Sequence, residues 1–145
     1  MKNILVTGGT GYIGSHTVVE LIQAGVHPII LDTLENSDKS VLEGIKAITN
    51  QDVTFYEGSY TDENLVKEII AKESIDGVIH FAAYKYVGES VEQPLKYYRN
   101  NVSGFVSFLN QLLSSGVDNF IFSSSAAIYG NPPTDKVTEE TPANP

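Results

Sequence analysis

The 145-residue sequence predicts an α/β fold built around one doubly wound parallel sheet. Short apolar runs alternate with segments of helical periodicity, which is the order that parallel strands with crossover helices require. The runs are continuous rather than alternating, as expected for strands covered on both faces. A glycine-spaced turn follows the first run, at the point where such sheets bind ligands. We expect right-handed crossovers and the strand order 3-2-1-4-5.

Five apolar runs are predicted as strands because each is short and bounded by polar or glycine-containing segments. In chain order the predicted strands are residues 3–6, 27–31, 52–56, 77–81 and 119–122. No internal repeat or linker interrupts them, so the chain is expected to form a single domain. The polar, proline-rich residues 131–145 that follow carry no helix or strand signal.

Helical segments fill the intervals between the strands. The predicted helices cover residues 14–24, 42–48, 65–70 and 91–113. Gly25 predicts the end of the first helix, because glycine adopts the left-handed conformation that follows many helices. Residues 61–64 resemble an N-cap followed by acidic residues, before the third helix. Asn100, Asn101 and Gly104 predict a bend within the longest helix.

The composition excludes several classes of partner. A formal net charge of −9 disfavours nucleic acid and anionic lipid. The absence of cysteine excludes disulfides and thiolate zinc sites. No apolar segment is long enough to cross a bilayer, and the first run lacks the features of a signal peptide. We therefore expect a soluble cytoplasmic protein with no nucleic-acid or membrane partner.

The glycine turn and one acidic residue predict a dinucleotide site. Gly8 permits a tight turn, Gly11 lets a pyrophosphate approach the backbone, and Gly14 lets the helix pack close to the sheet. The N–H groups at the start of that helix attract phosphate. Asp32 ends the second strand, where a carboxylate accepts hydrogen bonds from both ribose hydroxyls and repels a 2′-phosphate. Each signal alone also fits an ordinary turn or surface loop, but their context favours NAD over NADP.

Other polar residues fit plainer interpretations. Residues 123–125 are three serines that suit a polar strand end, although the carboxyl end of a central parallel strand favours contact with a ligand. His16, His27 and His80 are not paired at metal-ligand spacing, so structural or surface roles and no metal site are expected. The tyrosines between residues 84 and 98 are interpreted as packing residues rather than a base-stacking platform.

The spacing Gly-x-x-Gly-x-x-Gly resembles that of the extended short-chain dehydrogenase/reductase family. Within it, residues 80–91 (HFAAYKYVGESV) and 119–130 (NFIFSSSAAIYG) are similar to the UDP-glucose (UDP-galactose) 4-epimerases, and the resemblance covers essentially all 145 residues. It implies an isomerase of galactose metabolism. Such enzymes interconvert UDP-glucose and UDP-galactose through a 4-keto intermediate, with transient hydride transfer to NAD.

The resemblance also implies roles for individual residues. Ser125 would hydrogen-bond the reacting sugar hydroxyl and the catalytic phenol. The family commonly has Asp in place of Ser59, and serine accepts a hydrogen bond more weakly and without charge, which puts adenine affinity in question. The implied cofactor residues are Tyr12 and Ile13 at the pyrophosphate, Asn36 and Ser37 near the ribose held by Asp32, Ser59 and Tyr60 beside the adenine, Phe81, Ala82, Ala83 and Lys85 along the nicotinamide half, and Asn100 from the long helix.

The catalytic tyrosine of the family is followed by a lysine at the fourth position. The lysine and the nicotinamide charge lower the pKa of that phenol. None of the 8 tyrosines in the sequence has this spacing. We therefore expect residues 1–145 to be a NAD-binding domain truncated before the Tyr-x-x-x-Lys helix, without the sugar-nucleotide domain. The resemblance implies a UDP-sugar substrate and a homodimer for the parent enzyme, and inactivity for these residues alone.

The sequence is also compatible with other activities. Nucleotide-sugar 4,6-dehydratases share the glycine turn, but they use an Asp-Glu pair directly after the residue equivalent to Ser125. Ala126 and Ala127 stand there in this sequence and cannot transfer protons, which argues for epimerisation. A reductase that makes a deoxy sugar and a non-catalytic NAD-binding module are the remaining alternatives.

Overall fold

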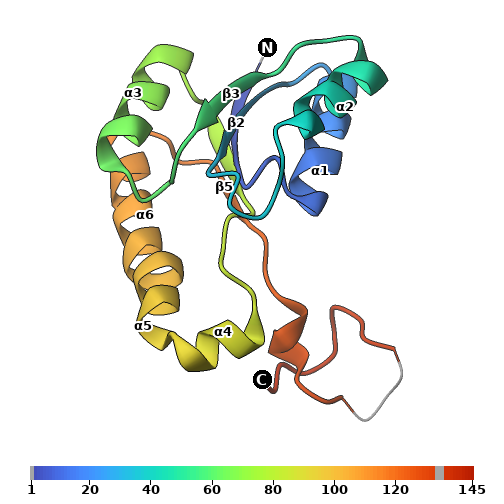
Figure 1. The fold of residues 1–145 in the computed structure, drawn as a ribbon, viewed down its shortest axis with the longest axis vertical. Coiled ribbons are helices and arrows are strands. Elements are labelled where there is room, and N and C mark those ends of the chain that lie inside the picture. The colour runs from blue at the N-terminus through green and yellow to red at the C-terminus, as the bar shows by residue number, and fades with distance from the viewer. Residues whose placement is uncertain (1, 133–135) are drawn as a thin grey trace.

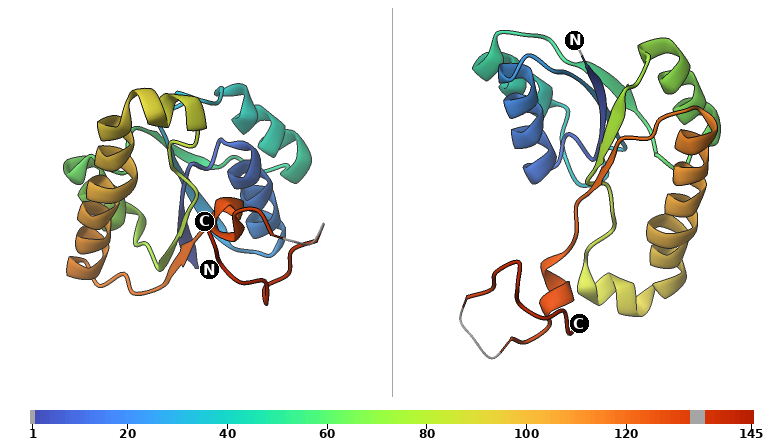
Figure 2. Two further views of the ribbon diagram at one scale, coloured as in Figure 1. Left: turned by 90° about the horizontal axis from the view of Figure 1, so that it is seen from below. Right: turned by 180° about the vertical axis from the view of Figure 1, so that it is seen from behind.

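A computed structural model describes residues 2–132 and 136–145. Its centre is a five-stranded sheet in the order β3-β2-β1-β4-β5, in which every pair of neighbours is parallel. Helices α1 and α2 cover one face, and α3 and α6 cover the other (Figures 1 and 2). The predicted fold class and strand order are confirmed.

All predicted strands are present, with ends shifted by one or two residues. They are β1 (Asn3–Thr7), β2 (His27–Asp32), β3 (Thr54–Glu57), β4 (Gly77–His80) and β5 (Phe120–Phe122). Successive residues of a strand supply the cores on opposite faces of the sheet. Leu5 packs with the cluster under α3 and α6, whereas Val6 packs with the cluster under α1 and α2, and both are fully buried. This two-sided burial explains the continuous apolar runs.

The helices of the first half follow the sequence signals. They are α1 (Tyr12–Gln23), α2 (Ser40–Thr49) and α3 (Glu63–Glu73). Gly25 has φ +75°, and the N–H of Val26 donates to the carbonyl of Leu21 at 2.9 Å, which closes α1 as predicted. The N-cap of α3 is Asp62, one residue later than predicted, and its carboxylate accepts from the N–H groups of Asn64 and Leu65.

The single helix predicted over residues 91–113 is wrong in its first part. The structure has α4 (Val87–Glu92), a break at Gln93, α5 (Pro94–Tyr97), a π-helical stretch η1 (Tyr98–Gly104) and α6 (Phe105–Ser114). The break precedes Pro94, because proline disfavours helical backbone in the residue before it. The predicted bend corresponds to the π-helical stretch. A Cβ on Gly104 would collide with the side chain of Thr61, so glycine is required at this close approach.

The far edge of the sheet is short and incompletely covered. β5 has three residues, and the side chains of Ile121 and Phe122 are 62% and 57% exposed. A short 3₁₀ helix, η2 (Ala126–Tyr129), follows, and residues 136–145 contain no helix or strand. None of the described helices is long and apolar enough to cross a membrane. The cytoplasmic location stays a prediction.

Candidate cofactor-binding site

A large cleft lies at the carboxyl ends of the strands. Figure 1 shows α4 beyond this end of the sheet. Its volume is about 1570 Å³. That exceeds the roughly 300–1,000 Å³ of ordinary small-molecule pockets and is large enough for an extended ligand. The cleft brings together every site residue proposed from the sequence. These are Gly8, Gly11, Tyr12, Ile13, Gly14, Asp32, Asn36, Ser37, Ser59, Tyr60, Phe81, Ala82, Ala83, Lys85, Asn100 and Ser125.

The turn between β1 and α1 requires its glycines. Gly8 has φ +72°, and a Cβ there would lie 2.8 Å from the backbone nitrogen of Ala82. A Cβ on Gly14 would collide with the carbonyl oxygen of Gly8. Gly14 therefore permits close packing of the helix on the turn itself, rather than on the sheet as the sequence suggested. A side chain at either position would displace the turn that borders the cleft.

The first turn of α1 offers backbone N–H groups to the cleft. Gly11 is the N-cap residue, no side chain caps the helix, and its first turn contains no acidic residue. Tyr12 and Ile13 are 81% and 60% exposed, and both line the cleft. Uncapped N–H groups and the positive end of the helix dipole together suit a phosphate group.

The carboxylate of Asp32 is held in place by the backbone on both sides. One oxygen accepts from the N–H of Thr10 at 3.1 Å, and the other accepts from the N–H of Leu34 at 3.0 Å. The hydroxyls of Thr10 and Ser37 lie 2.7 Å apart and share a further hydrogen bond. Each carboxylate oxygen keeps acceptor capacity, so Asp32 is a fixed acceptor for hydroxyl groups in the cleft.

The two residues proposed to flank an adenine differ in what they present. The Ser59 hydroxyl is within 2.8 Å of that of Thr61 and accepts from the Thr61 N–H at 3.1 Å. The Tyr60 side chain lies in the core, 4% exposed, and its hydroxyl donates to the carbonyl of Asn100 at 2.7 Å. Burial raises the pKa of Tyr60 to about 12, so its phenol stays protonated. Tyr60 can therefore offer the cleft mainly its backbone.

Asn101 fixes the segment that follows β4, and sequence reasoning missed this role. Its side-chain oxygen accepts from the N–H of Tyr84 at 3.0 Å, and its side-chain nitrogen donates to the Tyr84 carbonyl at 2.8 Å. The side-chain nitrogen of Asn100 also donates to the Asn101 oxygen, at 2.8 Å. Both asparagines belong to the π-helical stretch, a feature often found at functional sites. Phe81 and Lys85, which belong to the same segment as Tyr84, also line the cleft.

His80, which was not proposed as a site residue, also lines the cleft. It is 3% exposed, and its Nδ1 atom shares a hydrogen bond of 2.7 Å with the hydroxyl of Thr7. The rings of Tyr60, Phe105 and Phe108 surround the imidazole with centroids within 5.6 Å. Burial lowers the pKa of His80 to about 4, so the ring is neutral at pH 7. The hydrogen bond between Thr7 and His80 joins the ends of β1 and β4 beneath the cleft. It fits the structural role expected for His80.

The serines after β5 face the same cleft. The N–H of Ser123 donates to the carbonyl of His80 at 3.1 Å, which continues the strand pairing. The hydroxyl of Ser125 accepts from the N–H of Ala127 at 3.2 Å and caps η2, while its side chain remains exposed. Ser125 is thus positioned by the chain but not buried. Among the described residues no group of three or more His, Cys, Asp or Glu side chains is arranged to hold a metal ion.

The strand order, the glycine turn and the fixed carboxylate of Asp32 together define a Rossmann-type dinucleotide-binding domain. Residues 5–145 match the family model described as GDP-mannose 4,6 dehydratase. A UDP-glucose 4-epimerase from Klebsiella pneumoniae is 49% identical over 130 residues, which cover 90% of this chain and 94% of that relative. The chain belongs to the UDP-glucose 4-epimerase family.

Other relatives are longer than this chain. The UDP-glucose 4-epimerase of Neisseria meningitidis serogroup A is 51% identical over 142 residues, or 98% of this chain and 42% of the relative. The crystal structure of the enzyme from Stenotrophomonas maltophila, with bound NAD and formylated UDP-arabinopyranose, has a TM-score of 0.91 and 43% identity. That match covers 99% of this chain and 43% of the crystallised one. The present chain thus spans less than half the length of these relatives.

Proposed function

We propose that residues 1–145 form the NAD-binding part of a UDP-glucose 4-epimerase. The observation that carries this proposal is the glycine turn, whose uncapped helix lies beside the fixed carboxylate of Asp32. The residues present fit NAD, because a Cβ at Gly8 or Gly14 would collide with neighbouring backbone and displace the turn, and because the first turn of α1 has no side-chain cap. Solved relatives from Stenotrophomonas maltophila and Bifidobacterium longum contain NAD.

In the proposed complex the chain binds and orients the dinucleotide. Backbone N–H groups at Tyr12 and Ile13 face the diphosphate, and Asp32 accepts from the two ribose hydroxyls. The same carboxylate repels a 2′-phosphate, which gives the preference for NAD over NADP. Asn36 and Ser37 border the ribose, and the Ser59 and Tyr60 backbone borders the adenine. Lys85 and Asn100 border the nicotinamide half together with residues 81–83.

When bound, NAD would accept a hydride from the sugar and return it to the opposite face. The chain's own contribution on the sugar side is the exposed hydroxyl of Ser125, which we assign to the reacting sugar hydroxyl of a UDP-sugar. Ala127 also lines the cleft next to it and carries no group that can transfer a proton. This arrangement favours epimerisation over dehydration.

The proton-transferring tyrosine would come from chain outside these 145 residues. None of the tyrosines present is followed by a lysine at the fourth position. Tyr60, the most buried of the described tyrosines in the cleft wall, has its pKa raised rather than lowered and is unsuited to act as a base. We therefore propose that residues 1–145 bind NAD without catalysing turnover, and that a sugar-nucleotide domain completes the enzyme.

Self-association is part of the proposal. Leu95, Tyr98, Val102 and Val106 recur at helical spacing along α5, η1 and α6, and each is at least 51% exposed. Such a stripe of apolar side chains is unusual on an isolated surface and favours burial against another protein chain. We propose a homodimer that uses this helical face.

Calorimetric titration with NAD and with NADP tests the cofactor assignment. Asp32→Ala is expected to weaken NAD binding about 10- to 100-fold, because two hydrogen bonds to a charged acceptor are lost. NADP binding should weaken less, because repulsion of the 2′-phosphate is also lost. Asp52→Ala is the matched control, since Asp52 is exposed, pairs with Lys46 and does not line the cleft. Equal binding by wild type and Asp32→Ala would refute the ribose contact.

A further inference from the structure

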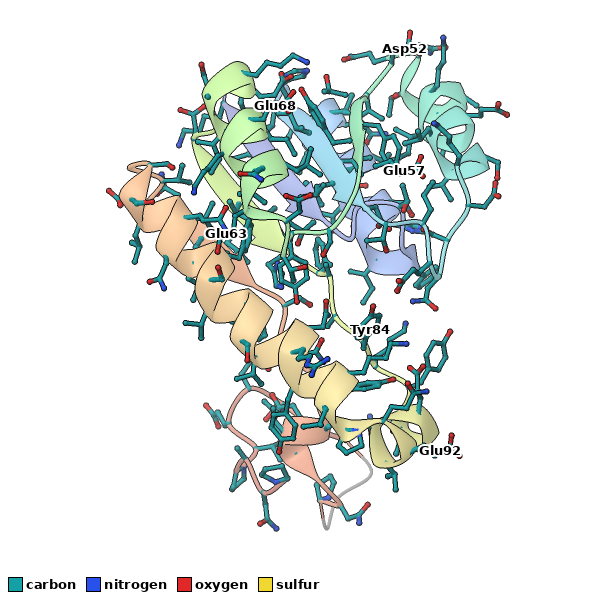
Figure 3. The ribbon with its side chains drawn as sticks, turned by 60° about the vertical axis from the view of Figure 1, so that its left-hand side comes forward. Asp52, Glu57, Glu63, Glu68, Tyr84 and Glu92 are labelled. Atoms are coloured by element: carbon teal, nitrogen blue, oxygen red, sulfur yellow. The ribbon has the colours of Figure 1, made fainter. Side chains whose placement is uncertain are left out.

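A second, smaller hollow opens beside the cofactor-binding cleft. Its volume is about 320 Å³, and its lining consists of Glu35, Asn36, Tyr84, Tyr86, Glu89 and Lys96. All of these except Glu89 also line the cleft. At this hollow the loop after β2, which follows Asp32, meets the segment that runs from β4 into α5. Figure 3 shows Tyr84 between the sheet and α4, which carries Glu92.

Lys96 makes the central contacts of the hollow. Its ammonium nitrogen lies 2.7 Å from a carboxylate oxygen of Glu89 and 4.5 Å from the centre of the Tyr84 ring. The side chains of Lys96 and Glu89 are 38% and 29% exposed. A partly desolvated ion pair and cation–π contact interact more strongly than the same pairs on an open surface.

The partners of Lys96 are themselves held by other groups. The two hydrogen bonds between the Asn101 side chain and the Tyr84 backbone fix that backbone. The second carboxylate oxygen of Glu89 accepts from the Tyr97 hydroxyl at 2.7 Å. The rings of Tyr84 and Tyr97 lie 5.6 Å apart. Lys96 therefore connects two side chains whose positions are already restricted.

Tyr84 connects this cluster to the loop after β2. Burial and the adjacent carboxylate of Glu35 both raise the pKa of Tyr84, so its hydroxyl remains protonated at neutral pH. Glu35 belongs to the same loop as Asn36 and Ser37, and Ser37 bonds to Thr10 of the glycine turn. The side chains of Glu35, Tyr84, Lys96 and Glu89 all line the hollow, which therefore extends from this loop to α4.

We propose that Lys96 is a positioning residue for the cofactor, because it holds Tyr84 beside Glu35 and thereby fixes the 33–37 loop next to the ribose site. With this contact in place, the loop opens less often and a dinucleotide leaves the cleft more slowly. The inference rests on the proposed function, since it requires the adenosine ribose to lie at Asp32.

The test compares three variants of the same protein. Lys96→Met removes the charge but keeps a long side chain, and Lys96→Arg restores both the ion pair and the contact with the ring. Lys46→Met is the matched control, because Lys46, on α2, forms a 2.8 Å ion pair with Asp52 and lines neither the cleft nor the hollow. Two quantities are measured: the NAD dissociation rate by stopped flow, and amide hydrogen exchange of residues 33–37 without NAD.

Lys96→Met should release NAD about three- to tenfold faster, with faster loop exchange. Lys96→Arg should return both quantities close to wild type, and Lys46→Met should leave them unchanged. If Lys96→Met matches Lys46→Met in both measurements, the positioning role is overturned. If wild type binds no NAD, the proposed function fails, and the exchange comparison alone then decides whether Lys96 fixes the loop.

Discussion

Acidification provides a quantitative test of the buried imidazole at the end of β4. His80 is 3% exposed, and burial lowers its pKa from 6.5 to about 4. The unfolded chain therefore binds a proton at this residue below about pH 6.5, whereas the folded protein binds it only near pH 4. Stability contributed by the neutral ring is present above pH 6.5 and is lost as the pH falls toward 4.

The size of this loss follows from the two pKa values. One unit of pKa difference corresponds to about 1.4 kcal/mol, so His80 alone should lower the unfolding free energy by about 3 kcal/mol between pH 7 and pH 4. His80→Phe keeps an aromatic ring among Tyr60, Phe105 and Phe108 but leaves the Thr7 hydroxyl without its partner. That should cost about 1–3 kcal/mol at pH 7. The variant and wild type should therefore become similar in stability near pH 4.

Urea unfolding of wild type and His80→Phe between pH 7 and pH 4 measures this convergence. Carboxylates titrate in the same range but contribute equally to both proteins, so the difference between the two curves isolates His80. His16→Phe is the control, because His16 is exposed on α1. An NMR titration of the His80 ring gives its pKa directly. A midpoint near 6.5, or stability curves that stay parallel, would refute the reasoning.

Three further substitutions test the cradle, the core and the helical face. Gly14→Ala should abolish measurable NAD binding by calorimetry, because its Cβ would collide with the Gly8 carbonyl. Gly44→Ala is the control and should bind NAD normally, because its Cβ would meet nothing within 4 Å. Gln111→Leu should raise the unfolding free energy by about 1–2 kcal/mol in urea titrations. The reason is that both buried side-chain amide atoms of Gln111 lack a hydrogen-bond partner in the described part of the chain. A destabilised variant would show that this amide has a hydrogen-bond partner in solution. Val102→Glu should shift light scattering toward monomer, and a wild type that is already monomeric would contradict the proposed dimer.

The sequence alone determined the elements and their order. Local signals decided these features: apolar runs, helical spacing and Gly25 as a helix end. The glycine turn and Asp32 were predictable because a phosphate cradle needs backbone freedom at fixed spacing and a carboxylate at the next strand end. The single helix over residues 91–113 was wrong, because the helical spacing continued across Pro94 although the backbone did not.

The tertiary structure decided which distant side chains support the site. His80 bonds to Thr7 across 73 residues of sequence, and Asn101 clamps Tyr84 across 17. Neither pair can be recognised in the sequence by a periodic pattern or a fixed spacing. Each of these residue types fits the local structure at its position equally well without the partner. The sequence therefore determined where the proposed dinucleotide site lies, and only the packing of β1, β4 and the π-helical stretch decided which groups hold its walls.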